Sequence, residues 1–203
     1  FHGAMTGFDV NVCAAKWKEL KVGEHGDIAV EEFLDACDSI ISILDAMGSG
    51  LGMVKSDMTG NVGHIRRNAA KFGPGVTLQA MVKKDIEDKV EGKDGSTALS
   101  LLWLKRALHF LDQLIVHLLK NAGMEVADAG RAAYADTLTH HHNFAVRQIF
   151  KVAITAVPYR KDFMAKIAGS EEQAMPALAG ISPSFSNAVL AIHFFLLAAA
   201  VEK

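Results

Sequence analysis

This chain is poor in several residue types, and each shortage excludes a class of protein. Its 203 residues include only two cysteines, Cys13 and Cys37, too few for a disulfide framework and not spaced as metal ligands. Aromatic residues make up 7% of the chain and its formal net charge at pH 7 is -2, so neither a basic surface nor a stacking platform for nucleic acid is expected. Such a low cysteine content favours a reducing, cytoplasmic location.

Long apolar runs are also lacking. The most apolar segment, residues 188–201, is shorter than the about 20 residues that a membrane span needs, and His193 interrupts it. We expect it to form a helix that is buried all round or that lines an apolar cavity. No signal peptide is expected, and Phe1 to Met5 are interpreted as partly cloning-derived. Residues 1–20 are therefore taken as an N-terminal segment and residues 21–203 as one helical domain.

With only four prolines and no alternating run of β-branched residues, the sequence predicts an all-α fold. Alanine, leucine and methionine, all good helix formers, are abundant. The absence of repeats and linker-like segments indicates a single domain of about eight helices packed in two layers. Loops are expected around Pro158, Pro176 and Pro183, and helices are expected over 27–47, 57–71, 77–90, 96–121, 128–156, 161–168 and 184–201.

The most informative pattern is a polar stripe in the helix predicted over 57–71. Asp57, Asn61 and His64 are spaced i, i+4 and i+7, so they project from one helix face, next to an apolar stripe on the same helix. A carboxylate, an amide and an imidazole offer donors and acceptors without a block of charge, which suits a neutral polyol better than a phosphate. The alternative is an ordinary solvated helix face.

Trp103 lies in the most apolar predicted helix, at helical spacing from Leu99 and Phe110. A tryptophan in such a place is commonly a core residue. The functional alternative is an indole plate against which the apolar face of a sugar ring lies flat. Lys105 and Arg106 point elsewhere on the same helix and are expected to be surface charges.

Together, these segments resemble one known family. The residues that carry the resemblance are Ser56–Arg67, Leu99, Leu102, Trp103-Leu104-Lys105-Arg106, Tyr134, Leu138, His142 and Phe144. They resemble the glycolipid transfer protein family, which implies a two-layer helical sandwich that carries lipid, with no catalytic residues and no cofactor. The implied ligand is one glycosphingolipid, and the implied location is the cytoplasm, peripheral at membranes.

The resemblance also implies a role for each headgroup residue. Trp103 stacks on the sugar ring, and Asp57 and Asn61 bind its hydroxyls, with His64 on the same helix face. The family histidine, here His142, binds the amide that joins the acyl chain to the sphingoid base. Asp57 can accept from the amide N–H while His142 donates to its carbonyl.

Some positions depart from the family pattern or separate its branches. Phe144 stands where animal members usually have a tryptophan thought to act at the membrane surface, although phenylalanine occurs in fungal relatives. His64 stands where lysine is typical, so selectivity for sulfated headgroups does not follow from the resemblance. Relatives that bind ceramide-1-phosphate have lysine in place of Asn61 and arginines in place of Trp103 and Ala107, so this chain favours a glycolipid.

The hydrocarbon chains are expected in an apolar pocket. At about 0.8 kcal/mol per methylene, exposing two long chains to water would cost on the order of 20 kcal/mol. A bilayer shelters the chains equally well, so selection of the lipid must fall to the polar residues. The residues expected to line the pocket are Phe33, Leu99, Leu102, Phe110, Leu138, Phe144, Phe150, Phe185, Val189 and Phe194.

Rival functions have less support. An enzyme that uses Asp57 and His142 as acid and base has no Gly-x-Ser-x-Gly, His-Glu-x-x-His or phosphate-loop motif to support it. Two further candidates are a lipid sensor or scaffold with little net transfer and a carrier of ceramide-1-phosphate. His140-His141-His142 would diverge by about 100° per residue on a helix, so no metal site is predicted there.

Residues 32–38 loosely resemble an acidic two-phenylalanine motif that docks proteins on an endoplasmic-reticulum receptor. Phe33 and Leu34 also fit the core stripe of the first predicted helix. A motif inside a helix cannot be bound as an extended peptide. We therefore favour the core interpretation, with receptor docking as the alternative.

Overall fold

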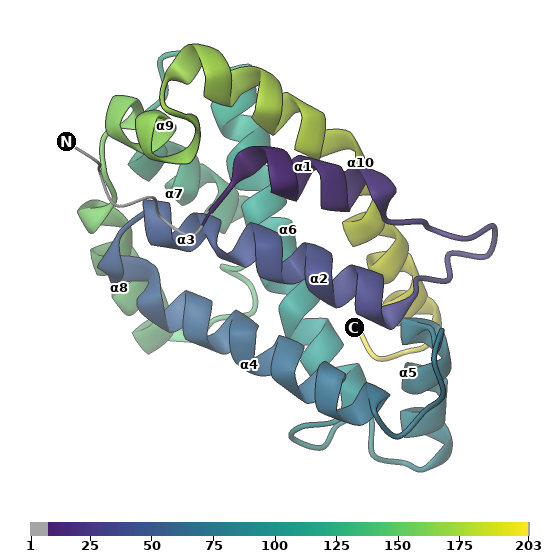
Figure 1. Cartoon of the computed structure of the whole chain (residues 1–203). Coiled ribbons are helices and arrows are strands. Elements are labelled where there is room, and N and C mark those ends of the chain that lie inside the picture. The colour runs from purple at the N-terminus through teal and green to yellow at the C-terminus, as the bar shows by residue number, and fades with distance from the viewer. Residues whose placement is uncertain (1–7, 203) are drawn as a thin grey trace.

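The computed structural model describes residues 8–202, so Phe1 to Met5, expected to be partly cloning-derived, lie outside the described residues. The described chain is all-α, as the sequence predicts, with an isolated antiparallel bridge between Ala29 and Thr77. The helices shown in Figure 1 are α1 (Val10–Glu19), α2 (Val30–Ile41), α3 (Ile43–Ala46), α4 (Gly52–Ala69), α5 (Leu78–Glu87), α6 (Thr97–Lys120), α7 (Val126–Asp136), α8 (Phe144–Ala153), α9 (Arg160–Ala168) and α10 (Glu171–Ala198), with 3-10 turns η1 (Ser49–Leu51) and η2 (Ile154–Ala156).

Five of these helices enclose the core. α1 packs on α2 and α10, α10 on α6, α6 on α4, and α4 on α2, so each helix contacts the next around a closed ring. In Figure 1, α1, α2 and α4 form the near layer, and α6 and α7 lie behind them. The largest buried phenylalanines, each stabilising the fold by about 1.5–3 kcal/mol relative to exposure, are Phe33, Phe110, Phe163 and Phe185.

The first helix, α1, lies within the segment 1–20 that the sequence analysis separates from the domain, and it packs in the core. The Trp17 ring on α1 lies 4.5 Å from the Phe185 ring and 6.4 Å from the Phe33 ring, measured between centroids. Trp17 is completely buried. The shared core therefore includes α1 and extends to residues before position 21.

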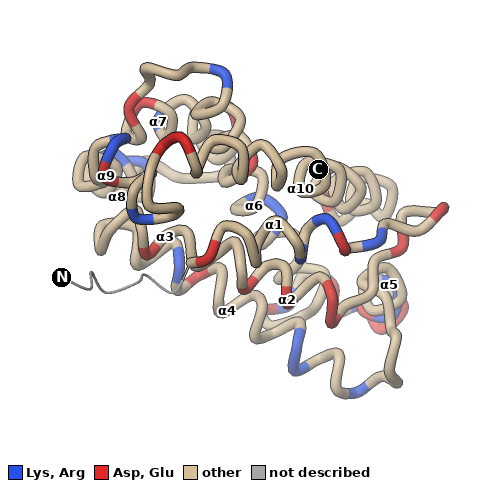
Figure 2. Tube along the Cα trace, turned by 45° about the horizontal axis from the view of Figure 1, so that its top comes forward, with Lys and Arg blue, Asp and Glu red and all other residues tan. Residues whose placement is uncertain are grey.

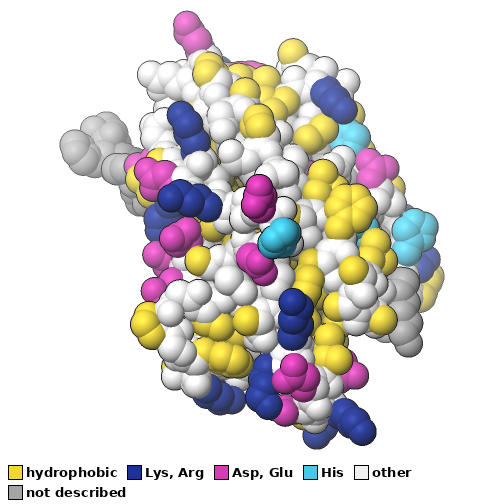
Figure 3. Space-filling view, turned by 90° about the vertical axis from the view of Figure 1, so that its right-hand side faces the viewer, with side chains coloured by type: hydrophobic (Ala, Val, Ile, Leu, Met, Phe, Trp, Pro, Cys, Tyr) yellow, Lys and Arg dark blue, Asp and Glu magenta, His cyan; other side chains and the backbone are white. Residues whose placement is uncertain are grey.

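Most charged residues lie on the surface, where the two signs are mixed. Figure 2 shows Lys and Arg alternating with Asp and Glu along most of the chain, while α10 carries few charges. Figure 3 shows one face of the molecule on which both signs are interspersed between hydrophobic side chains. This distribution agrees with the small net charge and gives this face no broad patch of one sign.

Polar caps start two of the helices where the sequence places them. Ser96, the first residue of the helix predicted over 96–121, accepts a hydrogen bond from the Leu99 N–H and starts α6. Thr77 accepts from the Ala80 N–H in the same way at the start of α5. Each cap satisfies a backbone donor that the first turn leaves unpaired, so these boundaries are encoded locally.

Two helices predicted as continuous are each divided in two. The helix predicted over 27–47 is interrupted at Ser42, which separates α2 from α3. The prediction of one continuous helix over 128–156 is wrong in its middle, where a loop separates α7 from α8. The Thr137 hydroxyl donates back to a carbonyl of α7, and the Asn143 side chain caps the first turn of α8. The resulting loop carries the three consecutive histidines.

The loops predicted around Pro176 and Pro183 are also wrong, because α10 runs unbroken through both prolines. The two prolines lie on the exposed face of the helix, as do Glu172 and Ala179, whose carbonyls each lose a helical hydrogen bond. Water can satisfy those carbonyls while the opposite face stays packed. By length and composition α10 alone among the described helices could cross a membrane; in the structure it packs against α1 and α6.

Candidate functional site

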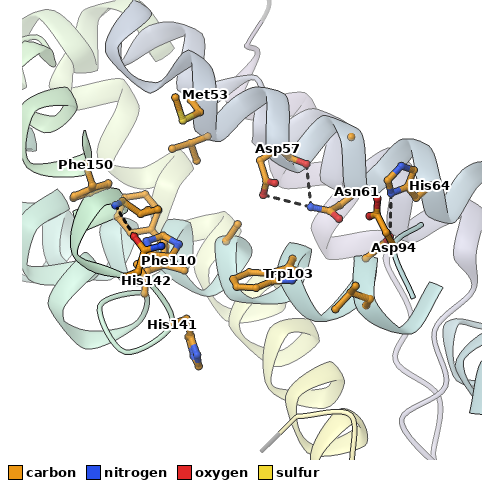
Figure 4. A pocket seen from close by; sticks show the side chains of 18 residues that line it. Met53, Asp57, Asn61, His64, Asp94, Trp103, Phe110, His141, His142 and Phe150 are labelled. Atoms are coloured by element: carbon orange, nitrogen blue, oxygen red, sulfur yellow. Dashed lines mark hydrogen bonds between the residues drawn. The ribbon is translucent and has the colours of Figure 1, made fainter. Parts of the chain in front are cut away.

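A pocket of about 640 Å³ lies between α4, α6 and the loop that joins α7 to α8 (Figure 4). Its volume falls within the range of about 300–1,000 Å³ that is usual for small-molecule sites. The lining residues with polar side chains are Asp57, Asn61, His64, Asp94, Ser100, Trp103, His141, His142 and Asn143. The remaining lining residues are Met53, Val54, Gly60, Leu99, Ala107, Phe110, Leu138, Val146 and Phe150.

The predicted polar row lies on α4, and all three of its members line this pocket. The Asn61 side-chain amide donates to the Asp57 backbone carbonyl at 3.0 Å and lies 3.4 Å from Asp57 Oδ2. His64 Nδ1 lies 3.3 Å from the Ser100 hydroxyl oxygen on α6. The neighbouring apolar stripe of α4 is buried in the core. The helix therefore turns one face to the core and a hydrogen-bonding face to the pocket.

Asp57 and His142 line the pocket from different elements, α4 and the α7–α8 loop. Burial raises the pKa of the Asp57 carboxyl, with a smaller opposing effect from His142. Burial also lowers the pKa of His142, although the charge of Asp57 acts against this change. At neutral pH the His142 imidazole is therefore uncharged, with one ring nitrogen as donor and the other as acceptor.

Tyr134, which belongs to a cluster with two phenylalanine rings, contacts His142 and orients it. The Tyr134 hydroxyl oxygen lies 2.8 Å from His142 Nδ1. The Tyr134 ring stacks on the Phe150 ring, with centroids 3.8 Å apart and planes 9° apart, and Phe150 meets Phe110 edge-on at 5.6 Å. The hydroxyl contact occupies one imidazole nitrogen and leaves the other for a ligand.

Trp103 lines the pocket with a cation above its ring. The Arg106 guanidinium carbon lies 4.9 Å from the ring centroid, which is cation–π geometry. Arg106 Nε donates to Glu202 Oε1 at 3.4 Å, and Lys105 Nζ donates to Glu202 Oε2 at 2.5 Å. The expectation that Lys105 and Arg106 are surface charges is wrong, because both pair with the Glu202 carboxylate and their side chains are 4% and 13% exposed.

Four of the ten residues expected around the hydrocarbon chains lie together in this pocket. They are Leu99, Phe110, Leu138 and Phe150, and they are joined there by apolar side chains of α4 and α8. They come from α6, α8 and the α7–α8 loop, whereas the polar row comes from α4. The pocket therefore places a row of polar groups beside a set of apolar side chains, and Leu99, Phe110, Leu138 and Phe150 are called its apolar wall.

The structure does not bring the other six expected residues into the pocket. Phe33, Leu102, Phe185 and Val189 are buried in the core outside it. Phe144 and Phe194 lie on the surface, with 76% and 63% of each residue exposed. Phe144 is the first residue of α8, and Phe194 lies on the outer face of α10.

Some lining residues were not identified from the sequence. Met53 precedes Asp57 by four residues, so extending the polar stripe by one helical turn would have found it. Asp94 lies in the loop between α5 and α6, where no periodicity indicates the direction of a side chain. His141 belongs to the run of three histidines, for which the sequence predicts no site, and the α7–α8 loop brings it to the pocket. Within residues 8–202, no three His, Cys, Asp or Glu side chains gather as candidate metal ligands.

The segment that loosely resembles a receptor-docking motif lies in α2. Phe33 is completely buried and Leu34 is 1% exposed. Both side chains contribute to the hydrophobic core cluster. The apolar part of that motif is therefore not presented at the surface of the fold.

Known proteins match this chain over most of its length. The family model described as Glycolipid transfer protein (GLTP) matches residues 28–169. A glycolipid transfer protein from Aureobasidium melanogenum is 40% identical over 175 residues, which cover 85% of each chain. The solved structure of HET-C2, a fungal glycolipid transfer protein, matches with a TM-score of 0.82 and 29% identity over 92% of this chain and 95% of that chain.

A second solved structure shares the fold at lower sequence similarity. Arabidopsis ACD11 in complex with ceramide-1-phosphate matches with a TM-score of 0.87, covering 95% of this chain and 96% of that chain. Its identity to this chain is 20%, so the match establishes the shared helical fold alone. Solved proteins with this fold thus include a glycolipid transfer protein and a protein in complex with ceramide-1-phosphate.

Proposed function

This chain belongs to the glycolipid transfer protein family, and on that premise we propose that it carries one glycosphingolipid at a time from membrane to membrane. Proteins of this family bind and transfer lipid and are not enzymes. The observation that carries the proposal is the pocket that brings Asp57, Asn61, Trp103 and His142 beside an apolar wall. A glycosphingolipid has matching parts: a sugar, an amide and hydrocarbon.

Sugar binding is assigned to Trp103 and the polar row of α4. The indole offers a flat apolar surface to the sugar ring, and Asp57 accepts hydrogen bonds from its hydroxyls. Asn61 already donates to Asp57, so its amide oxygen is the group left to accept from the sugar. Arg106, held by Glu202, keeps the indole in a fixed orientation.

The charges of the pocket support a glycolipid rather than ceramide-1-phosphate. In the part of the chain that the structure describes, no Lys or Arg lines it. A phosphate monoester is bound most strongly by such cations, which supply charge-assisted hydrogen bonds. Without them, a buried phosphate would lose its hydration and would not gain charge-assisted hydrogen bonds that compensate for the loss.

The amide of the lipid is assigned to Asp57 and His142. With the Tyr134 hydroxyl as donor to His142 Nδ1, the hydrogen of the neutral imidazole lies on Nε2 and can be donated to the amide carbonyl. Asp57 can accept from the amide N–H on the other side. Each such buried interaction contributes roughly 1–3 kcal/mol to selection of the ligand.

The hydrocarbon chains are assigned to the apolar wall and to the core beyond it. Leu99, Phe110, Leu138 and Phe150 receive the first part of the chains. The buried residues Phe33, Leu102, Phe185 and Val189 are proposed to line the remainder. They are buried in the hydrophobic core cluster, so the chains must displace side-chain contacts there, replacing one apolar contact by another.

Membrane contact is assigned to an exposed apolar surface at the pocket rim. Phe144, Ile149 and Val152 of α8 are 76%, 49% and 71% exposed, and Met53, which lines the pocket, is 68% exposed. Exposed apolar groups of this kind can enter the outer part of a bilayer. A lipid could then pass from the membrane into the pocket, and we place this event at the cytoplasmic face.

The test is transfer between vesicles with a panel of lipids of different headgroups. We expect glucosylceramide and galactosylceramide to be transferred and ceramide-1-phosphate and phosphatidylcholine to be left behind. Transfer of ceramide-1-phosphate as fast as glycolipid would overturn the headgroup assignment. Tight glycolipid binding without net transfer would instead identify a sensor or scaffold.

A further inference from the structure

Asp94 lines the pocket near Asn61 and His64 and is not among the residues proposed above to bind the amide and the first sugar. Its carboxylate points toward Asn61 and His64 (Figure 4). The residue is exposed, and among the described residues no ion pair or side-chain hydrogen bond engages it. An unpaired carboxylate turned toward a binding row is a group available to a ligand.

The loop that carries Asp94 is held to its neighbours. The Ser96 N–H donates to the Lys93 carbonyl at 3.1 Å, across a turn in which Gly95 has a φ of 76°. A positive φ at that position is what a type II turn requires, and glycine adopts it without strain. The Asn68 side chain on α4 donates to the Gly95 carbonyl at 2.9 Å. Asp94 is therefore held beside α4.

The polar row gives Asp94 a position relative to the lipid. Asp57, assigned to the amide and the first sugar, precedes His64 by seven residues on one helix. At about 1.5 Å per residue, the two lie about 10 Å apart along the helix axis. Asp94 lies at the His64 end of this row. In the proposed binding mode it faces the side of the first sugar that is remote from the amide, together with any substituent on that side.

The charge of Asp94 is not balanced within the pocket. Among residues 8–202, those that line the pocket include two carboxylates, Asp57 and Asp94, and no Lys or Arg. Burial lowers the pKa of His141 and of His142, so neither supplies a positive charge at neutral pH. Lys93 is adjacent in sequence but is not among the lining residues. Arg106, which lies over the Trp103 ring, is paired with Glu202. At the His64 end, the described lining residues therefore include the Asp94 carboxylate and no Lys or Arg that balances it.

We propose that Asp94 restricts the pocket to uncharged sugar headgroups. This inference rests on the proposed glycolipid binding and specifies its substrate class. A hydroxyl of an uncharged sugar can donate to the carboxylate, whereas a sulfate on the same side brings a second negative charge against it. Asp94 is thus a specificity-determining residue, distinct from the residues that hold the amide and the first sugar.

The experiment compares transfer of sulfated and uncharged galactosylceramide between phosphatidylcholine vesicles at low ionic strength. Asp94→Asn removes the charge and keeps the size of the side chain, and Asp94→Lys reverses the charge. We expect the ratio of sulfated to uncharged transfer to rise about three- to tenfold in Asp94→Asn and further in Asp94→Lys. Near 1 M salt, where the Debye length is about 3 Å, the differences should shrink.

Glu87→Gln is the matched control, because it removes an exposed carboxylate of α5 outside the pocket. It should leave the ratio unchanged, and an equal rise in this variant would refute a local role for Asp94. An unchanged ratio in both Asp94 variants, with normal transfer of galactosylceramide, overturns the inference and leaves the proposed function standing. Failure of the unmodified chain to transfer any glycolipid overturns both.

Discussion

The Lys105 ammonium lies 2.5 Å from Glu202 Oε2, and both side chains are almost completely buried. The other oxygen of Glu202 accepts from Arg106, whose guanidinium lies over the Trp103 ring. An ion pair near the end of the described chain is thus linked through two contacts to the indole proposed to stack on the sugar. Changes at Glu202 should therefore alter both stability and the pocket.

Glu202→Ala should destabilise the fold by about 3–5 kcal/mol, because it leaves the buried Lys105 charge without its partner. Urea unfolding followed by circular dichroism would measure the change. The double variant Lys105→Met with Glu202→Leu should recover most of the loss, since it removes both charges. A loss below about 1 kcal/mol in the single variant would mean that the pair behaves as a solvated one.

Acidification should weaken the ion pairs that Glu202 forms with Lys105 and Arg106. Burial alone would raise the pKa of Glu202, but the hydrogen bond and charge of Lys105, together with His193, bring it below the usual range. A lowered native pKa gives stability that is present above the ordinary glutamate value of about 4.3 and is lost as pH falls through the native value. As the pH falls from the ordinary glutamate pKa through the native pKa of Glu202, we expect the free energy of unfolding to decrease less in Glu202→Gln than in the unmodified chain. Parallel curves of unfolding free energy against pH would contradict this assignment.

Asp57→Val should nearly abolish glycolipid transfer while leaving the fold intact. Because burial raises the pKa of Asp57, the fold disfavours its charged form, and removing the carboxylate should not lower stability at neutral pH. The donors of the sugar and amide would then lose their acceptor, at about 1–3 kcal/mol for each group. Transfer assays and thermal unfolding on the same preparation separate the two effects. Normal transfer by the folded variant would show that the headgroup site is misassigned.

Tyr134→Phe should slow transfer several-fold with little loss of stability. The change removes the hydroxyl 2.8 Å from His142 Nδ1 but keeps the ring that stacks on Phe150. The loss of one hydrogen bond corresponds to about 0.5–1.5 kcal/mol. Tyr159→Phe is the matched control, since Tyr159 is 75% exposed and does not line the pocket. Equal rates for the two variants would mean that the orientation of His142 does not depend on Tyr134.

The features of the fold that could be predicted from sequence are those determined by local chemistry. Ser96 and Thr77 mark helix starts because each cap bonds to a backbone N–H three residues on. The course of α10 could not be predicted in this way. Its prolines break the local rule, and the helix persists because Leu178, Ile181 and Phe185 keep their places in the core.

The same division applies to the candidate site. The row Asp57, Asn61 and His64 follows from helical spacing, so the sequence alone predicted that these residues share a face. The burial of Lys105 depends on Glu202, 97 residues away, and no periodicity indicates such a pairing. Asp94 was missed for a related reason, since a loop side chain has no preferred face until the helices around it are placed.

His64→Lys should increase transfer of sulfated relative to uncharged galactosylceramide. A neutral imidazole offers one donor and one acceptor, whereas lysine offers three donors and a permanent positive charge that attracts a sulfate. His64 lines the pocket near Asp94, so the new ammonium can also neutralise that carboxylate. The double variant with Asp94→Asn therefore tests coupling: if the two charges interact, its sulfated-to-uncharged ratio should rise by less than the product of the single effects. An unchanged ratio in His64→Lys would mean that position 64 does not face the sugar, and the sugar-binding row would then consist of Asp57 and Asn61 alone.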